Sequence, residues 1–236
     1  NGMFAFSIWD KNKKKLFLVR DQVGIKPLYY TIKDNNILFA SEIKALAQSG
    51  IMEPELDESS LEKFLFYRYI PDEMTFFKGI KKLLAGDILE FSNGNISITN
   101  YRNIEPMNTG ELSDKALVQN LRAISEKSVR RRLMSEVPLG IFLSGGIDSS
   151  TIAALTYINS VNNISTFSVG FSNQSSDSEL PYALQVAKSF NSRHFEKIIG
   201  IEEVLENLPK IAWHYDEPIG DGAVIPTFLI SKLARE

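Results

Sequence analysis

The sequence contains no cysteine among its 236 residues. This absence excludes disulfide bonds and thiolate metal sites, and it fits a reducing compartment, so we expect a cytoplasmic location. The sequence also lacks any apolar run approaching the ~20 residues of a membrane span. Its first residues carry neither the basic leader nor the cleavage site of a signal peptide. We therefore expect no membrane partner.

The sequence likewise lacks an excess of positive charge. The formal net charge is −3 at pH 7, which gives no bulk attraction to nucleic acid, so we expect no nucleic-acid partner. The basic run Arg130–Arg132 has no interleaved aromatic residues, and it indicates a solvated helix face or contacts with a neighbouring domain. Hydrophobic residues make up 44% and charged residues 23% of the chain, which is ordinary for a soluble globular protein with one or two cores.

The most informative segment is Ser144–Ser150, which reads SGGIDSS. The apolar segment Val137–Leu143 before it is typical of a buried strand, and Thr151–Asn159 after it is typical of a helix. The pattern predicts a strand, a glycine turn and a helix. The first N–H groups of such a helix have no partner within the helix and lie at its positive end, so the turn can hold an anion.

The composition of this turn suits a phosphate group. Two adjacent glycines let the backbone approach an anion without an intervening Cβ, serine hydroxyls add donors, and Asp148 supplies an oxygen ligand of the kind that Mg2+ prefers. The residues expected to hold the anion are Ser144, Gly145, Gly146, Ser149 and Ser150. A Walker A loop is excluded because no lysine closes the turn, and a dinucleotide fingerprint is excluded because a third spaced glycine is missing. An ordinary Gly-Gly turn with a Ser/Asp helix cap stays open as the alternative.

The first hundred residues predict short antiparallel strands, because aromatic and β-branched segments alternate with turn residues. The expected strands are Met3–Trp9, Lys15–Arg20, Leu28–Ile32, Ile37–Ala40, Asp87–Phe91 and Asn95–Thr99. The expected helices of this part are Ser41–Gln48 and Glu58–Tyr69, the second capped by Asp57.

The rest of the chain alternates between helix and strand, which predicts a parallel sheet. After a long helix capped by Ser113, the expected elements are strands Ile141–Leu143, Ile164–Val169 and His194–Ile199 and helices Glu179–Phe190 and Ile201–Trp213. Right-handed crossovers would bring the carboxyl ends of the first two strands side by side, where an open α/β sheet binds its ligand. The backbone at Val169 would then lie beside the glycine turn that holds the anion.

Three segments of the N-terminal part match a known domain in order: Asn1–Phe6 with Trp9-Asp10, Arg20–Tyr30 and Ala40–Leu46. Through them this part resembles the class II, N-terminal-nucleophile (Ntn) glutaminase domain of the asparagine synthetases. In that family the nucleophile is an N-terminal cysteine activated by its own α-amino group. Because the sequence contains no cysteine, we expect no catalytic residue in the glutaminase part and no glutamine hydrolysis by this chain.

The C-terminal part resembles the synthetase domain of the same family, which carries the pyrophosphate loop (PP-loop) of the ATP pyrophosphatases. The matching segments are Val137–Ser150, Thr166–Phe171, Tyr182-Ala183 with Val186-Ala187, and Asp216–Pro218 with Pro226-Thr227. The resemblance implies that ATP contacts Leu143 and Val169 and that Asp148 binds Mg2+. The full implied ATP-binding set is Leu143, Ser144, Gly145, Gly146, Asp148, Ser149, Ser150 and Val169.

Two further groups of polar residues have competing interpretations. The acidic residues Asp216, Glu217 and Asp221 could help bind Mg2+ or the ammonium group of a substrate, or they could be turn formers on a solvated loop. We leave both interpretations open. His194 stands where the family often has a His pair, with Phe195 in the second place, and we expect His194 to be structural.

The expected fold is therefore α/β and α+β, with two partial domains. Residues 1–100 are expected to form the C-terminal part of an antiparallel, β-rich Ntn glutaminase domain, residues 101–112 a linker, and residues 113–236 the N-terminal part of a doubly wound PP-loop domain. Because the family continues into a second glycine-rich acidic loop, the chain is expected to be an internal fragment that lacks both ends.

The resemblance implies a ligase that uses ATP and Mg2+ to convert aspartate and glutamine to asparagine and glutamate through β-aspartyl-AMP. The implied partners are small molecules, namely ATP, aspartate and glutamine-derived ammonia, and a homodimer is left open. One alternative is a related amidotransferase or β-lactam synthetase-like enzyme that acts on another carboxylate. A tRNA-modifying pyrophosphatase would need a basic surface and would lack the glutaminase strands. The last alternative is a non-catalytic nucleotide-binding or interaction module.

Overall fold

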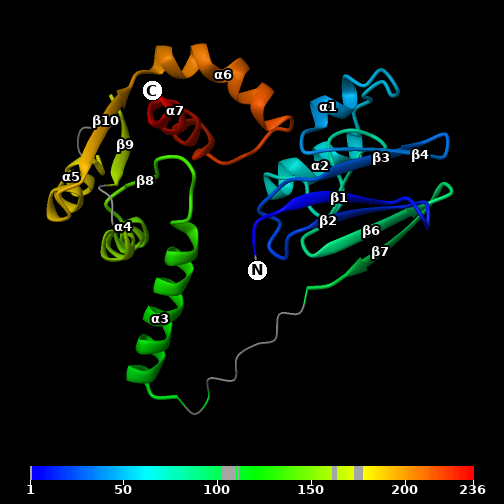
Figure 1. Cartoon of the computed structure of the whole chain (residues 1–236). Coiled ribbons are helices and arrows are strands. Elements are labelled where there is room, and N and C mark those ends of the chain that lie inside the picture. Colours follow the sequence, from blue (N-terminus) through cyan, green and yellow to red (C-terminus); the bar gives the residue numbers. More distant parts are fainter. Residues whose placement is uncertain (1, 103–109, 111, 161–163, 173–177) are drawn as a thin grey trace. The chain divides into compact units, whose positions relative to one another are not determined.

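The computed structural model describes residues 2–102, 110, 112–160, 164–172 and 178–236, and within it the chain divides into two compact units (Figure 1). The first unit comprises Asn1–Pro106 together with Ala212–Asp221, and the second comprises Met107–Ile211 with Gly222–Glu236. The predicted linker, residues 101–112, falls mostly outside the described residues. The prediction placed all of residues 113–236 in one domain, whereas residues 212–221 belong to the first unit.

The first unit contains a four-stranded antiparallel sheet in the order β1-β2-β6-β7. Its strands are β1 (Ala5–Asp10), β2 (Lys15–Arg20), β6 (Asp87–Ser92) and β7 (Asn95–Asn100). All four were expected at these places. The β6–β7 hairpin closes through Asn93 and Gly94, whose φ angles of 50° and 79° fit the turn that an Asn-Gly pair favours.

A second antiparallel sheet of the first unit has the order β4-β3-β5. It consists of β3 (Tyr29–Lys33), β4 (Asn36–Ala40) and β5 (Lys81–Lys82), beside the helices α1 (Ile43–Ala47) and α2 (Glu58–Tyr67). The side chain of Asp57 caps α2, as predicted, by accepting from the N–H of Ser59. Strand β5 was not predicted, because two lysines carry no strand pattern of their own.

The carboxylate of Asp21 organises the turn that follows β2. Asp21 is fully buried, and its two oxygens accept hydrogen bonds from four backbone N–H groups. The donors and N···O distances are Phe4 at 3.3 Å, Val23 at 3.1 Å, Ile25 at 3.0 Å and Lys26 at 3.0 Å. Burial raises the pKa of Asp21, but the four N–H donors together outweigh it and lower the pKa to about 2. The charged carboxylate therefore stays in place at neutral pH.

The second unit contains a three-stranded parallel sheet in the order β10-β9-β8. Its strands are β8 (Gly140–Phe142), β9 (Ser165–Phe171) and β10 (Arg193–Ile199). Its helices are α3 (Asp114–Arg132), α4 (Ile147–Asn159), α5 (Leu180–Ser189), α6 (Ile201–Tyr215) and α7 (Val224–Arg235), and the last turn of α6 belongs to the first unit. The expected pairing of the strands at Ile141 and Thr166 is confirmed, because these residues are register partners.

Helices pack against this sheet through small and aliphatic side chains. Helix α5 contacts β9 and β10, and α7 contacts β9. A buried cluster joins Leu143 with Ala153 of α4 and with Ala183 and Ala187 of α5. Several expected boundaries were wrong. Of the apolar segment Val137–Leu143 only Gly140–Phe142 is strand, and Val137 is exposed. Helix α4 begins at Ile147 rather than Thr151 because Gly146 occupies the N-cap, and β9 continues to Phe171 because its last residues still pair with β10.

The fold is thus mixed α/β, with antiparallel sheets in the first unit and a parallel sheet in the second. Arg130, Arg131 and Arg132 are exposed on α3, and Arg130 bonds Glu126 and Asn159, in line with the expected solvated face. No helix within the described ranges is both long enough and apolar enough to cross a membrane.

Candidate functional site

The candidate site lies where strands β8 and β9 end and the glycine turn begins. The N–H of Leu143 donates to Phe167 O at 2.8 Å, and the hydroxyl of Ser168 donates to Leu143 O. Both bonds hold the last residue before the turn against β9. The carboxyl end of β8 is therefore fixed beside its parallel neighbour, which is the edge at which open α/β sheets bind ligands.

The turn itself is tied together by serine hydroxyls. Ser149 Oγ lies 3.0 Å from Ser144 Oγ and 3.2 Å from Gly146 O, and it accepts from the N–H of Ser144 at 3.3 Å. The N-cap residue of α4 is Gly146, so no side chain caps this helix start. The open helix N-terminus, together with two hydroxyls, makes the turn suitable for an anion.

The backbone of Gly145 requires glycine for two separate reasons. Its φ angle is +82°, in the left-handed region that disfavours a Cβ. A Cβ at this position would also lie 2.6 Å from the backbone nitrogen of Ala183 and from Cβ of Tyr182. The first glycine of the turn therefore lets the turn pack directly on the start of α5.

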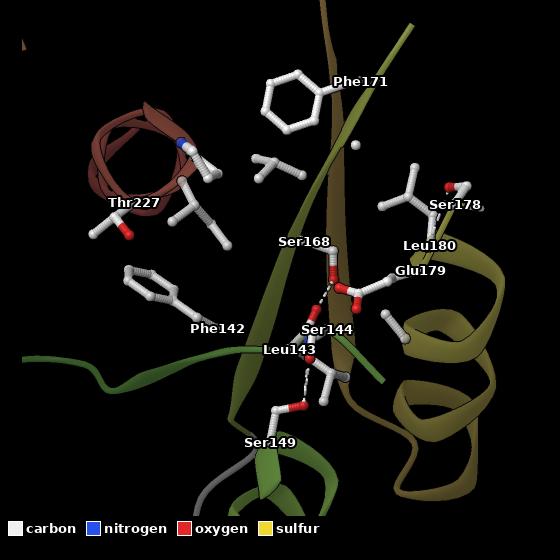
Figure 2. A pocket seen from close by; sticks show the side chains of 15 residues that line it. Phe142, Leu143, Ser144, Ser149, Ser168, Phe171, Ser178, Glu179, Leu180 and Thr227 are labelled. Carbon is white, nitrogen blue, oxygen red and sulfur yellow. Dashed lines mark hydrogen bonds between the residues drawn. The ribbon is translucent and has the colours of Figure 1, made fainter. Parts of the chain in front are cut away.

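A cavity of about 490 Å³ opens beside this turn (Figure 2). In Figure 2 helix α7 lies on one side of β9 and α5 on the other, and both contribute to the walls. The lining residues come from β8, the turn, β9, the start of α5 and α7. They are Phe142, Leu143, Ser144, Ser149, Ser168, Val169, Gly170, Phe171, Ser178, Glu179, Leu180, Ala183, Pro226, Thr227 and Ile230. Apolar walls together with the hydroxyls of Ser144 and Ser149 beside the glycine turn fit a ligand that has a flat apolar part and a charged part.

The structure brings four of the predicted ATP-binding residues into the cavity lining: Leu143, Ser144, Ser149 and Val169. Gly145, Gly146, Asp148 and Ser150 belong to the adjoining turn and first helical turn but do not line the cavity. Asp148 is exposed in the first turn of α4. The hydroxyl of Ser150 is buried and has no hydrogen-bond partner among the described residues.

Several lining residues were not predicted individually. Ser168 alternates with Val169 along β9, so its place on the strand was readable but not its bond to Leu143. Glu179 is the one carboxylate among the lining residues, and it stands immediately before α5. Thr227 comes from α7, and the sequence indicated its family match but gave no sign that this helix reaches the cavity.

The side chains at the glycine turn suit a Mg2+ ion that is bound mainly by the phosphates of a ligand. Across the part of the chain that the structure describes, no group of three or more His, Asp or Glu side chains could hold a metal ion. Mg2+ commonly takes one or two carboxylates and completes its shell with substrate phosphates and water. The exposed carboxylate of Asp148 at the open helix start fits that role.

The three acidic candidates near residue 220 lie in the first unit. The carboxylate of Asp216 pairs with Lys44 Nζ at 2.9 Å, and that of Glu217 lies 3.4 Å from Lys82 Nζ. Asp221 is exposed. None of the three lines the cavity beside the glycine turn.

His194 has the structural position that we expected for it. Its side chain is 6% exposed, its Nδ1 lies 2.8 Å from Thr166 Oγ1, and its Nε2 lies 3.0 Å from Glu196. Both ring nitrogens therefore have partners on the neighbouring strand or on its own strand, β10.

Comparison with known proteins identifies both parts of the chain. Residues 120–236 match the family model "Asparagine synthase", and residues 1–102 match "Glutamine amidotransferase domain". The chain belongs to the asparagine synthetase family. Its C-terminal part thus carries the synthetase resemblance and its N-terminal part the amidotransferase resemblance.

Individual relatives agree with this assignment. The glutamine-hydrolyzing asparagine synthetase 1 of Bacillus subtilis is 39% identical over the whole of this chain, which spans 37% of that protein. The putative glutamine-hydrolyzing asparagine synthetase 2 of Methanocaldococcus jannaschii is 34% identical over the whole chain, which spans 46% of it. Among solved structures, an NH3-dependent NAD synthetase from Campylobacter jejuni matches 50% of this chain and 52% of its own at 20% identity, with a TM-score of 0.34. The chain therefore spans less than half the length of these curated relatives.

Proposed function

We propose that this chain is part of a glutamine-dependent asparagine synthetase and that its second unit holds MgATP. The observation that carries the proposal is the cavity that joins the uncapped start of α4 to the ends of β8 and β9. The adenine would lie against Val169 and the apolar walls, and the phosphates would lie at Ser144, Gly145, Gly146, Ser149 and Ser150.

The reaction would be the activation of a carboxylate by adenylation. The side-chain carboxylate of aspartate attacks the α phosphate of ATP, which gives β-aspartyl-AMP and pyrophosphate, and ammonia then displaces AMP to give asparagine. Mg2+ held near Asp148 would neutralise charge on the leaving pyrophosphate. The turn would orient the β and γ phosphates through backbone N–H groups and serine hydroxyls, so that the α phosphate faces the acceptor.

The domain assignment completes the proposal. Residues 1–100 would be part of an Ntn-type glutaminase domain, residues 101–112 a linker, and residues 113–236 part of a doubly wound PP-loop domain. Because the sequence contains no cysteine, the thiol that releases ammonia from glutamine cannot come from these residues. Aspartate, ATP and ammonia are the proposed small-molecule partners, and whether the chain forms a homodimer stays open.

The experiment is isothermal titration of MgATP into the chain and into matched variants. Ser149→Ala removes a hydroxyl that lines the cavity, whereas Thr151→Ala removes one from the same helix whose oxygen bonds Ile147 O outside the cavity. We expect Ser149→Ala to weaken binding about tenfold, which is the usual cost of one hydrogen bond to a charged group, and Thr151→Ala to leave it unchanged. Gly146→Trp should abolish binding by blocking the turn. Equal affinities for MgATP in all variants would refute the site.

Asp148→Asn tests the proposed metal position in the same titration. We expect MgATP to bind about tenfold more weakly to this variant, while ATP in EDTA changes little or binds more tightly, because only the first depends on the carboxylate. The activity itself is then checked in the complete parent protein by following asparagine formation with ammonia as the nitrogen donor.

A further inference from the structure

Strand β8 ends earlier than its neighbour β9 in the second unit. Their register ends where Phe142 faces Phe167, and the N–H of Leu143 makes one further bond to Phe167 O at 2.8 Å. Strand β9 continues to Phe171, and there it pairs with β10 on its other side. Among the described residues, no strand pairs with the β8 side of β9 beyond Phe167.

The hydroxyl of Ser168 occupies the carbonyl that would form the next bond between the two strands. In a parallel pair, N–H and C=O groups follow one another at even spacing, so the carbonyl of Leu143 would next accept from the N–H of Val169. Instead it accepts from Ser168 Oγ (Figure 2). Both Ser168 and Leu143 are 2% exposed, so water is not an alternative partner for them. A serine that bonds a nearby backbone group in this way competes with sheet pairing.

This bond leaves the backbone of Val169 unpaired beside the cavity. Successive N–H groups along a strand point to opposite sides, so the N–H and C=O of Val169 face the same side as those of Phe167. Val169 lines the cavity beside the glycine turn. Within the described ranges, no backbone carbonyl of the turn accepts from the N–H of Val169. An unpaired N–H and C=O at a strand edge can bind a ligand that offers a matching acceptor and donor.

The base of the proposed nucleotide offers this match. Adenine presents a ring nitrogen that accepts a hydrogen bond and, next to it, an amino group that donates one. The N–H of Val169 suits the ring nitrogen and its C=O suits the amino group. The phosphates would lie at Ser144 and Ser149 on the turn, so the base and the phosphates would be held by different parts of the cavity lining.

We propose that Ser168 is a positioning residue of the nucleotide site. Its hydroxyl takes the carbonyl of Leu143, which ends the pairing of β8 with β9 and keeps the backbone of Val169 available to the base. The first part of the proposal, the ending of the pairing, is independent of any ligand. The second part, the binding of the base, rests on the proposed function. In both parts Ser168 acts through its neighbours.

The test compares two serines that each donate to a backbone carbonyl. Ser168→Ala frees the carbonyl of Leu143, whereas Ser189→Ala removes an exposed hydroxyl of α5 that donates to Gln185 O at 2.9 Å and does not line the cavity. Hydrogen–deuterium exchange of the Val169 amide, followed by NMR without nucleotide, reports whether its N–H has a partner. The amide of Phe167, which lies within the paired part of β9, is the internal reference.

We expect exchange at Val169 to slow about tenfold in Ser168→Ala, because the freed and buried carbonyl of Leu143 takes this N–H as the next donor in register. In Ser189→Ala, exchange at Val169 should stay within twofold of the parent chain. Exchange at Phe167 should be unchanged in both variants. The proposal is overturned if Ser168→Ala leaves exchange at Val169 unchanged, or if it speeds exchange at both amides together.

Titration with two magnesium-bound ligands tests the second part of the proposal. MgATP carries the base and the phosphates, whereas magnesium tripolyphosphate carries the phosphates alone. We expect Ser168→Ala to bind MgATP about tenfold more weakly and to bind tripolyphosphate as the parent chain does, because only the base depends on Val169. Ser189→Ala should bind both ligands as the parent chain does. An equal loss for both ligands in Ser168→Ala would show a merely structural role and overturn the positioning of the base.

The two measurements also separate this proposal from the nucleotide site itself. If exchange changes as expected while the parent chain binds neither ligand, the nucleotide site fails together with the second part of the proposal, and the first part stands. If the parent chain binds MgATP and Ser168→Ala binds it equally well with unchanged exchange, the site stands and the role of Ser168 fails. If both hold, the variant that protects the Val169 amide is also the one that loses affinity for MgATP.

Discussion

Asp21 offers the sharpest test of how the first unit is stabilised. Its folded pKa of about 2, against an ordinary value of 3.8, corresponds to about 2.5 kcal/mol of stability at neutral pH. In Asp21→Asn one oxygen becomes an NH2 group, so two of the four backbone N–H donors lose their acceptor. We expect the variant to lose about 2 to 4 kcal/mol of unfolding free energy.

The assay is urea unfolding followed by tryptophan fluorescence. The sequence has two tryptophans, Trp9 and Trp213, and both belong to the first unit, so the signal reports that unit alone. For an ordinary urea slope, the expected loss moves the midpoint down by roughly 1 to 2 M. The matched control is Asp10→Asn, because Asp10 accepts from Asn12 and Lys13 through a single oxygen in an exposed turn. This control should change stability by less than about 0.5 kcal/mol.

The dependence on pH fixes the sign of the effect. Because the folded pKa is lowered, the stabilisation is complete above pH 3.8 and is lost as the pH falls toward 2. The stability gap between the parent chain and Asp21→Asn should therefore be constant from pH 7 to 5 and shrink in more acidic solution. A midpoint shift no larger than that of Asp10→Asn, or a gap that widens in acid, would refute the reasoning.

Three other changes test the second unit. Gly145→Ala should lower the free energy of unfolding of the second unit by about 2 kcal/mol or more, because the residue has a φ of +82° and its Cβ would meet Ala183. Urea unfolding followed by far-UV circular dichroism measures this loss, and an unchanged midpoint would contradict the prediction. Glu179→Gln should tighten binding of metal-free ATP two- to threefold by removing a like charge from the cavity, whereas weaker binding would mean that the carboxylate assists. His194→Ala should lower the free energy of unfolding by about 1 to 3 kcal/mol, because the hydrogen bond between His194 and Thr166 is lost. The affinity for MgATP should stay unchanged, and a loss of affinity would contradict a structural role for His194.

Most of the local structure was predictable because the signals are local. Alternating strands, the Asn93-Gly94 turn and the caps at Asp57 and Ser113 each depend on residues within a few positions of one another. The glycine turn was predictable for the same reason, since strand, turn and helix lie in one continuous segment. Its contacts with Tyr182 and Ala183, which make Gly145 indispensable, involve residues almost forty positions away.

The features that the sequence could not indicate are the long-range ones. Strand β5 exists because Lys81 and Lys82 pair with Tyr30 and Tyr29, about fifty residues earlier. The acidic residues Asp216 and Glu217 read equally well as ligands or as turn formers, because spacing does not say which cations face them. Their lysine partners lie more than 130 residues away in the sequence, and only the folded chain brings them together.

The return of residues 212–221 to the first unit also affects how the chain is made. During synthesis the strands of the first unit leave the ribosome before Asp216 and Glu217, which pair with Lys44 and Lys82, have been made. About 105 further residues must be translated before Ala212 emerges, which takes roughly 5 to 20 seconds at ordinary rates. The first unit is therefore completed only after most of the second has been synthesised, and a ribosome stalled between residues 107 and 211 would carry a first unit in which Lys44 and Lys82 lack Asp216 and Glu217.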